Sequence, residues 1–270
     1  MEATTRQRRA DPRQVAVVAA LLAASALAWL ATSRRMAGMD AGPGTDPGTI
    51  GFYVSAWVAM MAAMMFPSLS PVVATYAEVE RGKRGRDGRG GLGTAAFVGG
   101  YLLAWTAFGL LAYGVYELGR SLDLGALSWG SDGRYVAAAA VGLAAVYQLT
   151  PLKDRCLSKC RNPLGFVVSS WRDGPLGAVV MGMQHGGWCI GCCWALMAVL
   201  FAVGVMSVAW MLAVALLVAA EKLLPWERLA NGAIAAVLVA LAIGVGWAPS
   251  DVPGLTVPDS EAAGGMSMSR

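Results

Sequence analysis

Residues 175–202 read PLGAVVMGMQHGGWCIGCCWALMAVLFA, a stretch without a single Asp, Glu, Lys or Arg. About 20 apolar residues in a helix are enough to cross the hydrocarbon core of a bilayer, which is about 30 Å thick. In lipid, a helix also satisfies its own backbone hydrogen bonds, which an irregular segment does not. This stretch therefore predicts a transmembrane helix.

Other apolar blocks of roughly spanning length lie on both sides of this one. They run from about Gln14 to Thr32, Gly51 to Ala77, Thr94 to Leu118, Tyr135 to Leu152, Ser207 to Leu224, and Gly232 to Trp247. The whole chain is 57% hydrophobic and 14% charged, whereas an average soluble domain has about 25% charged residues. The sequence therefore predicts an all-α, polytopic transmembrane bundle of about seven spanning helices rather than a soluble protein.

The Lys and Arg residues between these blocks predict the orientation of the chain. With a cytoplasmic N-terminus, most of the 21 Lys and Arg residues fall on the cytoplasmic side, as the positive-inside rule requires. We therefore expect an N-in, C-out, multi-pass protein of the cell inner (plasma) membrane. Because topology accounts for the positive charge, the lipid bilayer is an expected partner and nucleic acid is not.

The ends of the chain predict two short segments outside the membrane. Four arginines precede the first apolar block, which leaves a cleaved signal peptide open. That block is longer than the usual signal-peptide core of about 7–15 residues, so we favour an uncleaved helix. We divide the chain into a cytoplasmic N-terminal segment (1–13), a transmembrane helical domain (14–248) and a disordered tail rich in Pro and Gly (249–270).

Chemistry-bearing residues are concentrated in the 175–202 helix. His185 and Cys189 are four residues apart, and Cys192 and Cys193 follow three and four residues later, so neighbouring members share a helix face. Imidazole and thiolate are ligands for zinc, copper and iron. His185 lies about 15 Å along the helix, near the membrane midplane, where ionisable groups are functional candidates. The alternative is a structural histidine with cysteines that merely pack.

A methionine cluster in the second block has a similar expected depth. Met61, Met64 and Met65 share a helix face by their spacing. Thioethers together with thiolates favour Cu(I) over hard cations, so these side chains are candidate ligands across the bundle from the cysteines. Methionine also fills gaps in ordinary cores, which is the structural alternative.

A second pair of cysteines, Cys156 and Cys160, lies in a basic segment expected at the cytoplasmic surface. On a helical turn the pair can chelate a metal or form a reducible dithiol, and neighbouring Lys and Arg residues favour thiolates. Inert cytoplasmic thiols are the alternative. From the helical rise we expect this pair to lie about 20 Å from the Cys189 group along the membrane normal.

Several of these motifs together resemble a known family. They are Ala59–Pro67, Tyr147–Lys153 with Cys156 and Cys160, His185–Trp194, Trp210-Met211, and Glu221–Pro225. The pattern is similar to that of the DUF2182 family, a group of predicted metal-binding integral membrane proteins, over roughly Ile50 to Trp247. The resemblance implies an integral-membrane, metal-binding protein and no particular reaction. For Glu221, at the end of the sixth block, we expect a structural role.

Three functional hypotheses follow from these residues. The leading one is a non-enzymatic membrane protein that binds a soft transition metal, Cu(I) first and zinc second, and moves it or hands it to a metal-handling partner. Its ligands would be His185, Cys189, Cys192, Cys193, Met61, Met64 and Met65, with Cys156 and Cys160 as a cytoplasmic relay. The second is a thiol–disulfide oxidoreductase that uses Cys189 and Cys192. The third is a membrane scaffold or assembly factor without a metal site.

Overall fold

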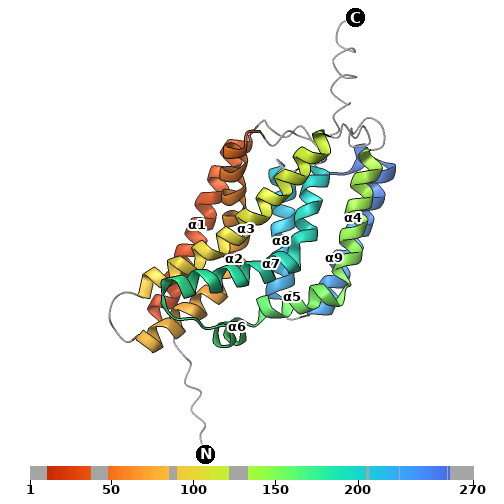
Figure 1. Cartoon of the computed structure of the whole chain (residues 1–270). Helices are drawn as coiled ribbons and strands as arrows, with labels where there is room; N and C mark the ends of the chain where they lie inside the picture. Colours follow the sequence, from red (N-terminus) through yellow and green to blue (C-terminus); the bar gives the residue numbers. More distant parts are fainter. Residues whose placement is uncertain are drawn as a thin grey trace, which may run out of the picture.

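The computed structural model describes residues 11–37, 48–84, 90–121, 133–204, 207–224, 226–253 and 255. Within these ranges the chain is helical and contains no β-strand, which confirms the all-α prediction (Figure 1). The helices are α1 (Pro12–Met36), α2 (Ile50–Arg84), α3 (Gly90–Ser121), α4 (Arg134–Gln148), α5 (Pro151–Arg161), α6 (Pro163–Ser169), α7 (Gly174–Val203), α8 (Val208–Leu223), α9 (Glu227–Trp247) and the short 3₁₀ helix η3 (Pro249–Asp251). Most of the predicted N-terminal segment and C-terminal tail lies outside the described residues.

Five of the described helices are long and apolar enough to cross a membrane, namely α1, α2, α3, α7 and α9. The pair α4 and α5 passes the same test together, with a 66° bend between the two helices. Helix α8 has 16 residues, which is shorter than the roughly 20 residues of an average span. The polytopic character of the chain is therefore confirmed, whereas the count of seven spans and the N-in orientation stay predictions.

The bend between α4 and α5 has a local cause in the sequence. Pro151 has no backbone N–H and cannot continue the hydrogen-bond ladder of α4, but it fits the first turn of a new helix. The Thr150 side chain caps that helix by accepting a hydrogen bond from the backbone N–H of Lys153. The fourth predicted block therefore divides at Thr150, and α5 turns across one end of the bundle together with α6 (Figure 1).

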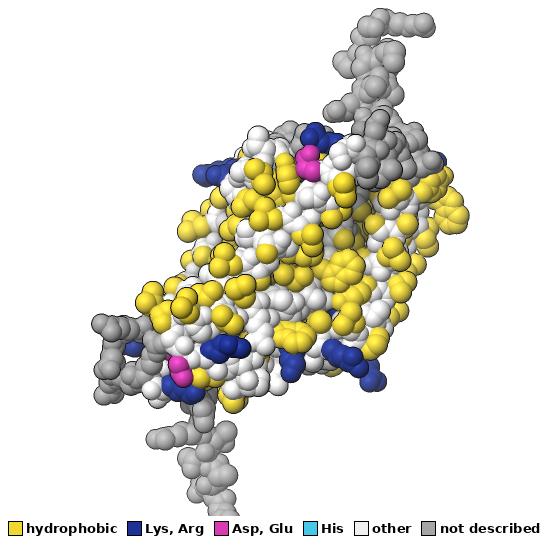
Figure 2. Space-filling model, in the orientation of Figure 1, with side chains coloured by type: hydrophobic (Ala, Val, Ile, Leu, Met, Phe, Trp, Pro, Cys, Tyr) yellow, Lys and Arg dark blue, Asp and Glu magenta, His cyan; other side chains and the backbone are white. Residues whose placement is uncertain are grey.

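The outer surface of the bundle has the polarity of a membrane protein. Large apolar side chains are exposed on several different helices, with Leu27, Leu111 and Leu143 each more than 60% exposed. Figure 2 shows these apolar side chains over the flank of the molecule, and Lys and Arg gathered mainly at its lower end. Exposed apolar surface of this extent marks a site of contact with lipid or another apolar partner.

Helix α7 packs against α3, α4, α5 and α8 in the bundle. Glycines allow α3 and α7 to pack closely. A Cβ atom at Gly100 would overlap the backbone of Val179, and one at Gly182 would overlap the backbone of Phe97. Small residues at helix contacts are the usual means of close approach in membranes. As a result, the buried side chain of Tyr101 on α3 lies directly against α7.

Helix α1 pairs with α2 at both ends. At the beginning of α1, the Asp11 carboxylate accepts a hydrogen bond from the Arg13 N–H and pairs with Arg81 at the end of α2. These two contacts hold the pKa of the Asp11 carboxyl below its ordinary value. At the opposite end, Arg35 donates to the hydroxyl of Ser55 at 3.2 Å. Between these two ends, the buried Ser25 hydroxyl of α1 donates to the carbonyl oxygen of Ala63 in α2 at 2.7 Å.

Candidate metal centre

Three cysteines of α7 form a compact sulfur cluster in the interior. Cys189, Cys192 and Cys193 are at most 1% exposed. Among the described His, Cys, Asp and Glu side chains, these three cysteines form a group that could hold one metal ion, and their sulfurs all lie within 4.8 Å of one another. Their spacing of three and four residues places the sulfurs on one helix face.

The spacing of these sulfurs suits a thiolate-bound metal. A metal–sulfur bond of about 2.3 Å places three sulfurs about 4.0 Å apart in a trigonal plane around the metal. Sulfurs within 4.8 Å of one another reach that spacing through small side-chain rotations. The cluster therefore matches the donor set of a soft cation.

The thiols of this cluster are held by the helix backbone. The carbonyl oxygen of Cys189 accepts a hydrogen bond from Cys192 Sγ at 3.1 Å and from Cys193 Sγ at 3.0 Å. Thiols must lose their protons to bind a metal, so binding replaces these two weak hydrogen bonds by metal–sulfur bonds. The Cys189 carbonyl oxygen does not need these two hydrogen bonds, because it lies within a continuous helix and accepts a backbone hydrogen bond there.

The sulfur of Cys189 has two polar neighbours from other helices. The Tyr101 hydroxyl on α3 lies 3.1 Å from Sγ, and the Lys222 ammonium on α8 donates to Sγ at 3.0 Å. Lys222 also donates to the Ser68 hydroxyl on α2 at 3.4 Å. Sequence reasoning missed Lys222 as a site residue. The sequence did contain a signal for Lys222, because a cation at the end of an apolar block is a functional candidate in a membrane.

The structure corrects the expected position of Cys160. Its sulfur lies 3.8 Å from that of Cys192, so the predicted separation of about 20 Å along the membrane normal is wrong. The prediction failed because the chain bends by 66° after α4, so that α5 runs across the end of the bundle and packs against α7. Cys160 therefore adds a fourth sulfur at the edge of the cluster.

Cys156 also packs against α7, although it is further from the cluster. Its sulfur lies beside Gly191, where a Cβ atom would come within 2.7 Å of Sγ. The Tyr147 hydroxyl at the end of α4 donates a hydrogen bond to the carbonyl oxygen of the same glycine. Gly191 is thus the point at which the segment around the bend between α4 and α5 contacts α7.

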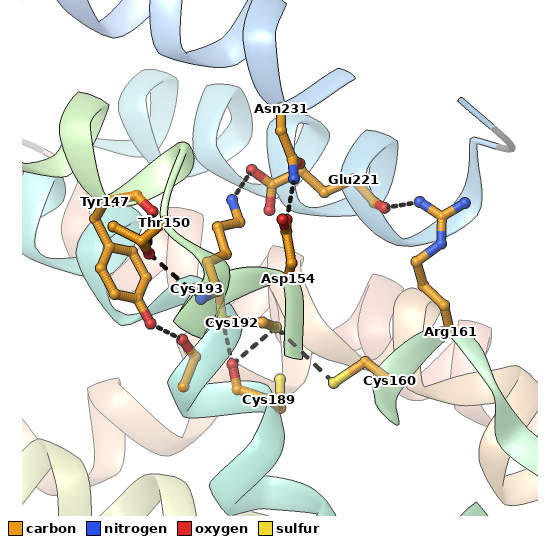
Figure 3. Close-up of polar contacts among 12 residues, drawn as sticks. Tyr147, Thr150, Asp154, Cys160, Arg161, Cys189, Cys192, Cys193, Glu221 and Asn231 are labelled. Carbon is orange, nitrogen blue, oxygen red and sulfur yellow. Dashed lines mark hydrogen bonds and ion pairs between the residues drawn. The ribbon is translucent and has the colours of Figure 1, made fainter. Parts of the chain in front are cut away.

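One ion pair and two hydrogen bonds join α5 to the end of α8. The fully buried Lys153 ammonium pairs with the Glu221 carboxylate of α8, which is also buried. Arg161, at the other end of α5, donates to the backbone carbonyls of Glu221 and Leu224. Figure 3 shows Glu221 above the three cysteines, and Cys160 and Arg161 to their right. The end of α8 therefore fixes the helix that carries Cys160.

His185 lies one turn before Cys189 but is outside the sulfur cluster. It is 3% exposed, and its ring has Phe97, Tyr101 and Phe166 as aromatic neighbours, with centroids 6.2, 6.1 and 4.8 Å away. Its Nδ1 has no hydrogen-bond partner among the described residues. A buried imidazole nitrogen without a partner retains a free lone pair or proton for a ligand.

The predicted methionine ligands are buried in α2. Met61, Met64 and Met65 are at most 2% exposed. Ser68 lies one turn beyond Met65 and donates to its carbonyl oxygen at 3.0 Å. Because the Lys222 ammonium contacts both Ser68 and Cys189, this turn of α2 is connected to the sulfur cluster through a single side chain.

Comparison with known proteins adds one family match. A family model described as copper chaperone (PpoB2) matches residues 54–245, which include all the cysteines and the α2 methionines. No curated protein and no solved structure gives a significant match to the chain. The matched region begins in α2 and ends in α9, so it covers every helix that contributes to the sulfur cluster.

Proposed function

Because this chain belongs to the PpoB2 copper chaperone family, we propose that it is a membrane-embedded protein that binds Cu(I) through Cys189, Cys192 and Cys193 and hands it to a partner protein. The observation that carries this proposal is the buried group of three sulfurs within 4.8 Å of one another. Helix α7, which carries the group, packs against α3, α4, α5 and α8, and both α7 and α3 are long and apolar enough to cross a membrane.

The donor set favours Cu(I) over zinc. Cu(I) is a soft cation that thiolate and thioether ligands select. A structural zinc site is almost always tetrahedral with four ligands, and the compact group has three sulfurs. Zinc becomes an alternative if Cys160 moves to serve as a fourth ligand, since its sulfur is 3.8 Å from that of Cys192.

Cys160 offers a route for handing the metal over. A metal held by Cys192 can exchange one thiolate for the neighbouring thiolate of Cys160, and Cys156 lies one helical turn earlier on α5. This ligand exchange would bring the metal from α7 to α5, the helix at the basic end of the bundle. His185 and the α2 methionines are proposed as further ligands on the path by which the metal reaches the three cysteines.

Elemental analysis of the detergent-purified protein tests this proposal. After anaerobic loading with Cu(I), we expect about one copper per chain in the parent and little in a Cys189→Ser/Cys192→Ser/Cys193→Ser variant. A Cys156→Ser variant is the matched control, since its sulfur lies outside the compact group, and it should retain the copper. Equal copper in the parent and the triple variant would exclude the α7 site.

The proximity of Cys160 and Cys192 also favours a second candidate function. Two thiols 3.8 Å apart can give up two electrons and two protons to a disulfide or quinone acceptor and form a disulfide. Under this reading the chain is a thiol–disulfide oxidoreductase. Acceptor reduction by the parent that is abolished in Cys160→Ser, while copper binding persists, would favour this function over copper handover.

A further inference from the structure

The Lys222 ammonium holds a defined position beside the proposed metal ligands. It lies 3.0 Å from Cys189 Sγ and 3.4 Å from Ser68 Oγ, so it is fixed between α7 and α2. The residue before it, Glu221, points to a different partner, the ammonium of Lys153. The two consecutive charges at the end of α8 thus face separate surroundings.

We propose that Lys222 makes the sulfur cluster selective for a monovalent soft cation over a divalent one. This inference rests on the proposed function, because it assumes that Cys189 is a metal ligand. It adds a specificity-determining residue that does not itself bind the metal.

The physical reason is that one ammonium acts on both the ligand and the metal. Its attraction to the Cys189 thiolate is the same whichever metal binds. Its repulsion of the metal grows with the charge of the metal, so a divalent cation is repelled twice as strongly as a monovalent one. The positive charge of Lys222 therefore disfavours zinc relative to Cu(I).

The distances make this repulsion substantial. A metal bound to Cys189 at about 2.3 Å would be at most about 5.3 Å from an ammonium that is 3.0 Å from the same sulfur. Cys189 is fully buried and Lys222 is partly buried, so their charges are screened less than those of an exposed pair. Groups next to metal ligands commonly change affinity by about 10- to 100-fold, and we expect an effect of this size on the ratio of affinities.

The experiment compares metal affinities of the full-length protein in detergent under anaerobic conditions. Dissociation constants for Cu(I), Ag(I) and Zn(II) are measured by competition with chelators for the parent, Lys222→Met and Lys222→Arg. In Lys222→Met we expect the ratio of zinc to Cu(I) affinity to rise by about 10- to 100-fold. Ag(I) should follow Cu(I), because both are monovalent, and Lys222→Arg should keep the parent ratio.

Two further variants keep the test decisive. Arg228→Met removes an exposed cation on α9 and should leave the ratio unchanged. Lys222→Gln is a second neutral variant for the case in which Lys222→Met does not fold. If neutral variants lose affinity for Cu(I) and zinc by the same factor, Lys222 is only structural and the inference is overturned. If the parent binds no Cu(I) or Ag(I), the proposed function fails and this inference fails with it.

Discussion

Removing the Glu221 carboxylate leaves the Lys153 ammonium in the interior without its ion-pair partner. The two side chains are 1% and 0% exposed, so water cannot replace the lost partner. Breaking a buried ion pair on one side costs about 3–5 kcal/mol, because an uncompensated charge stays buried. We therefore expect Glu221→Leu to lower the free energy of unfolding by about this amount.

The same reasoning predicts a recovery when both charges are removed. Replacing a buried pair by apolar residues of similar volume is often neutral or stabilising. The double variant Lys153→Met/Glu221→Leu should therefore unfold at about the parent denaturant concentration, although each single variant is destabilised. The control is Glu117→Gln, which breaks the exposed pair with Arg120 and should cost less than about 1 kcal/mol.

Unfolding of the parent, the two single variants, the double variant and the Glu117→Gln control in detergent, followed by circular dichroism against denaturant, provides the measurement. The exposure of Cys160 gives a second readout, since the Lys153–Glu221 pair holds α5 against α7. Its alkylation by a small thiol reagent should be faster in Glu221→Leu than in the parent. A single variant as stable as the parent, or a double variant less stable than both singles, would refute this account of the pair.

Three other changes have specific expected outcomes. Gly182→Leu should abolish folding or lower the free energy of unfolding by at least about 3 kcal/mol, because the new side chain would overlap the Phe97 backbone. Detergent size-exclusion chromatography and thermal unfolding measure this loss. A variant as stable as the parent would contradict the close helix contact. Tyr101→Phe removes the hydroxyl 3.1 Å from Cys189 and should weaken Cu(I) binding by about tenfold with little loss of stability, as chelator competition would show. Cys160→Ser should keep near-stoichiometric copper but slow its transfer to an acceptor chelator by at least about tenfold; unchanged stopped-flow transfer rates would exclude a relay role.

The spacing of residues in a single helix was sufficient to predict the three-cysteine group at the centre of the candidate site. Cys189, Cys192 and Cys193 lie on α7, and local helix geometry alone brings their sulfurs together. The same rules put His185 on that helix one turn earlier. They did not show that its ring would be surrounded by Phe97, Tyr101 and Phe166 rather than by sulfurs, because these neighbours come from other elements.

The positions of Cys160 and Lys222 depend on contacts between distant segments. Depth along a membrane normal can be estimated from helical rise only while a helix stays straight. After Thr150 the chain turns by 66°, and the direction of the turn is set by the pair between Lys153 and Glu221, 68 residues apart. No local pattern in the sequence encodes that pairing.

The sequence by itself determined that the chain consists of long apolar helices and that one of them carries a group of soft-metal ligand residues. Long uncharged blocks must be helices in lipid, because no water is present to satisfy their backbone groups, and cysteines three and four residues apart must share a helix face. The tertiary structure alone decided which side chains surround those cysteines. It places Cys160, Tyr101 and Lys222 around them, because packing between helices depends on glycines such as Gly182 and on the buried pair of Lys153 and Glu221, whose partners are far apart in the chain.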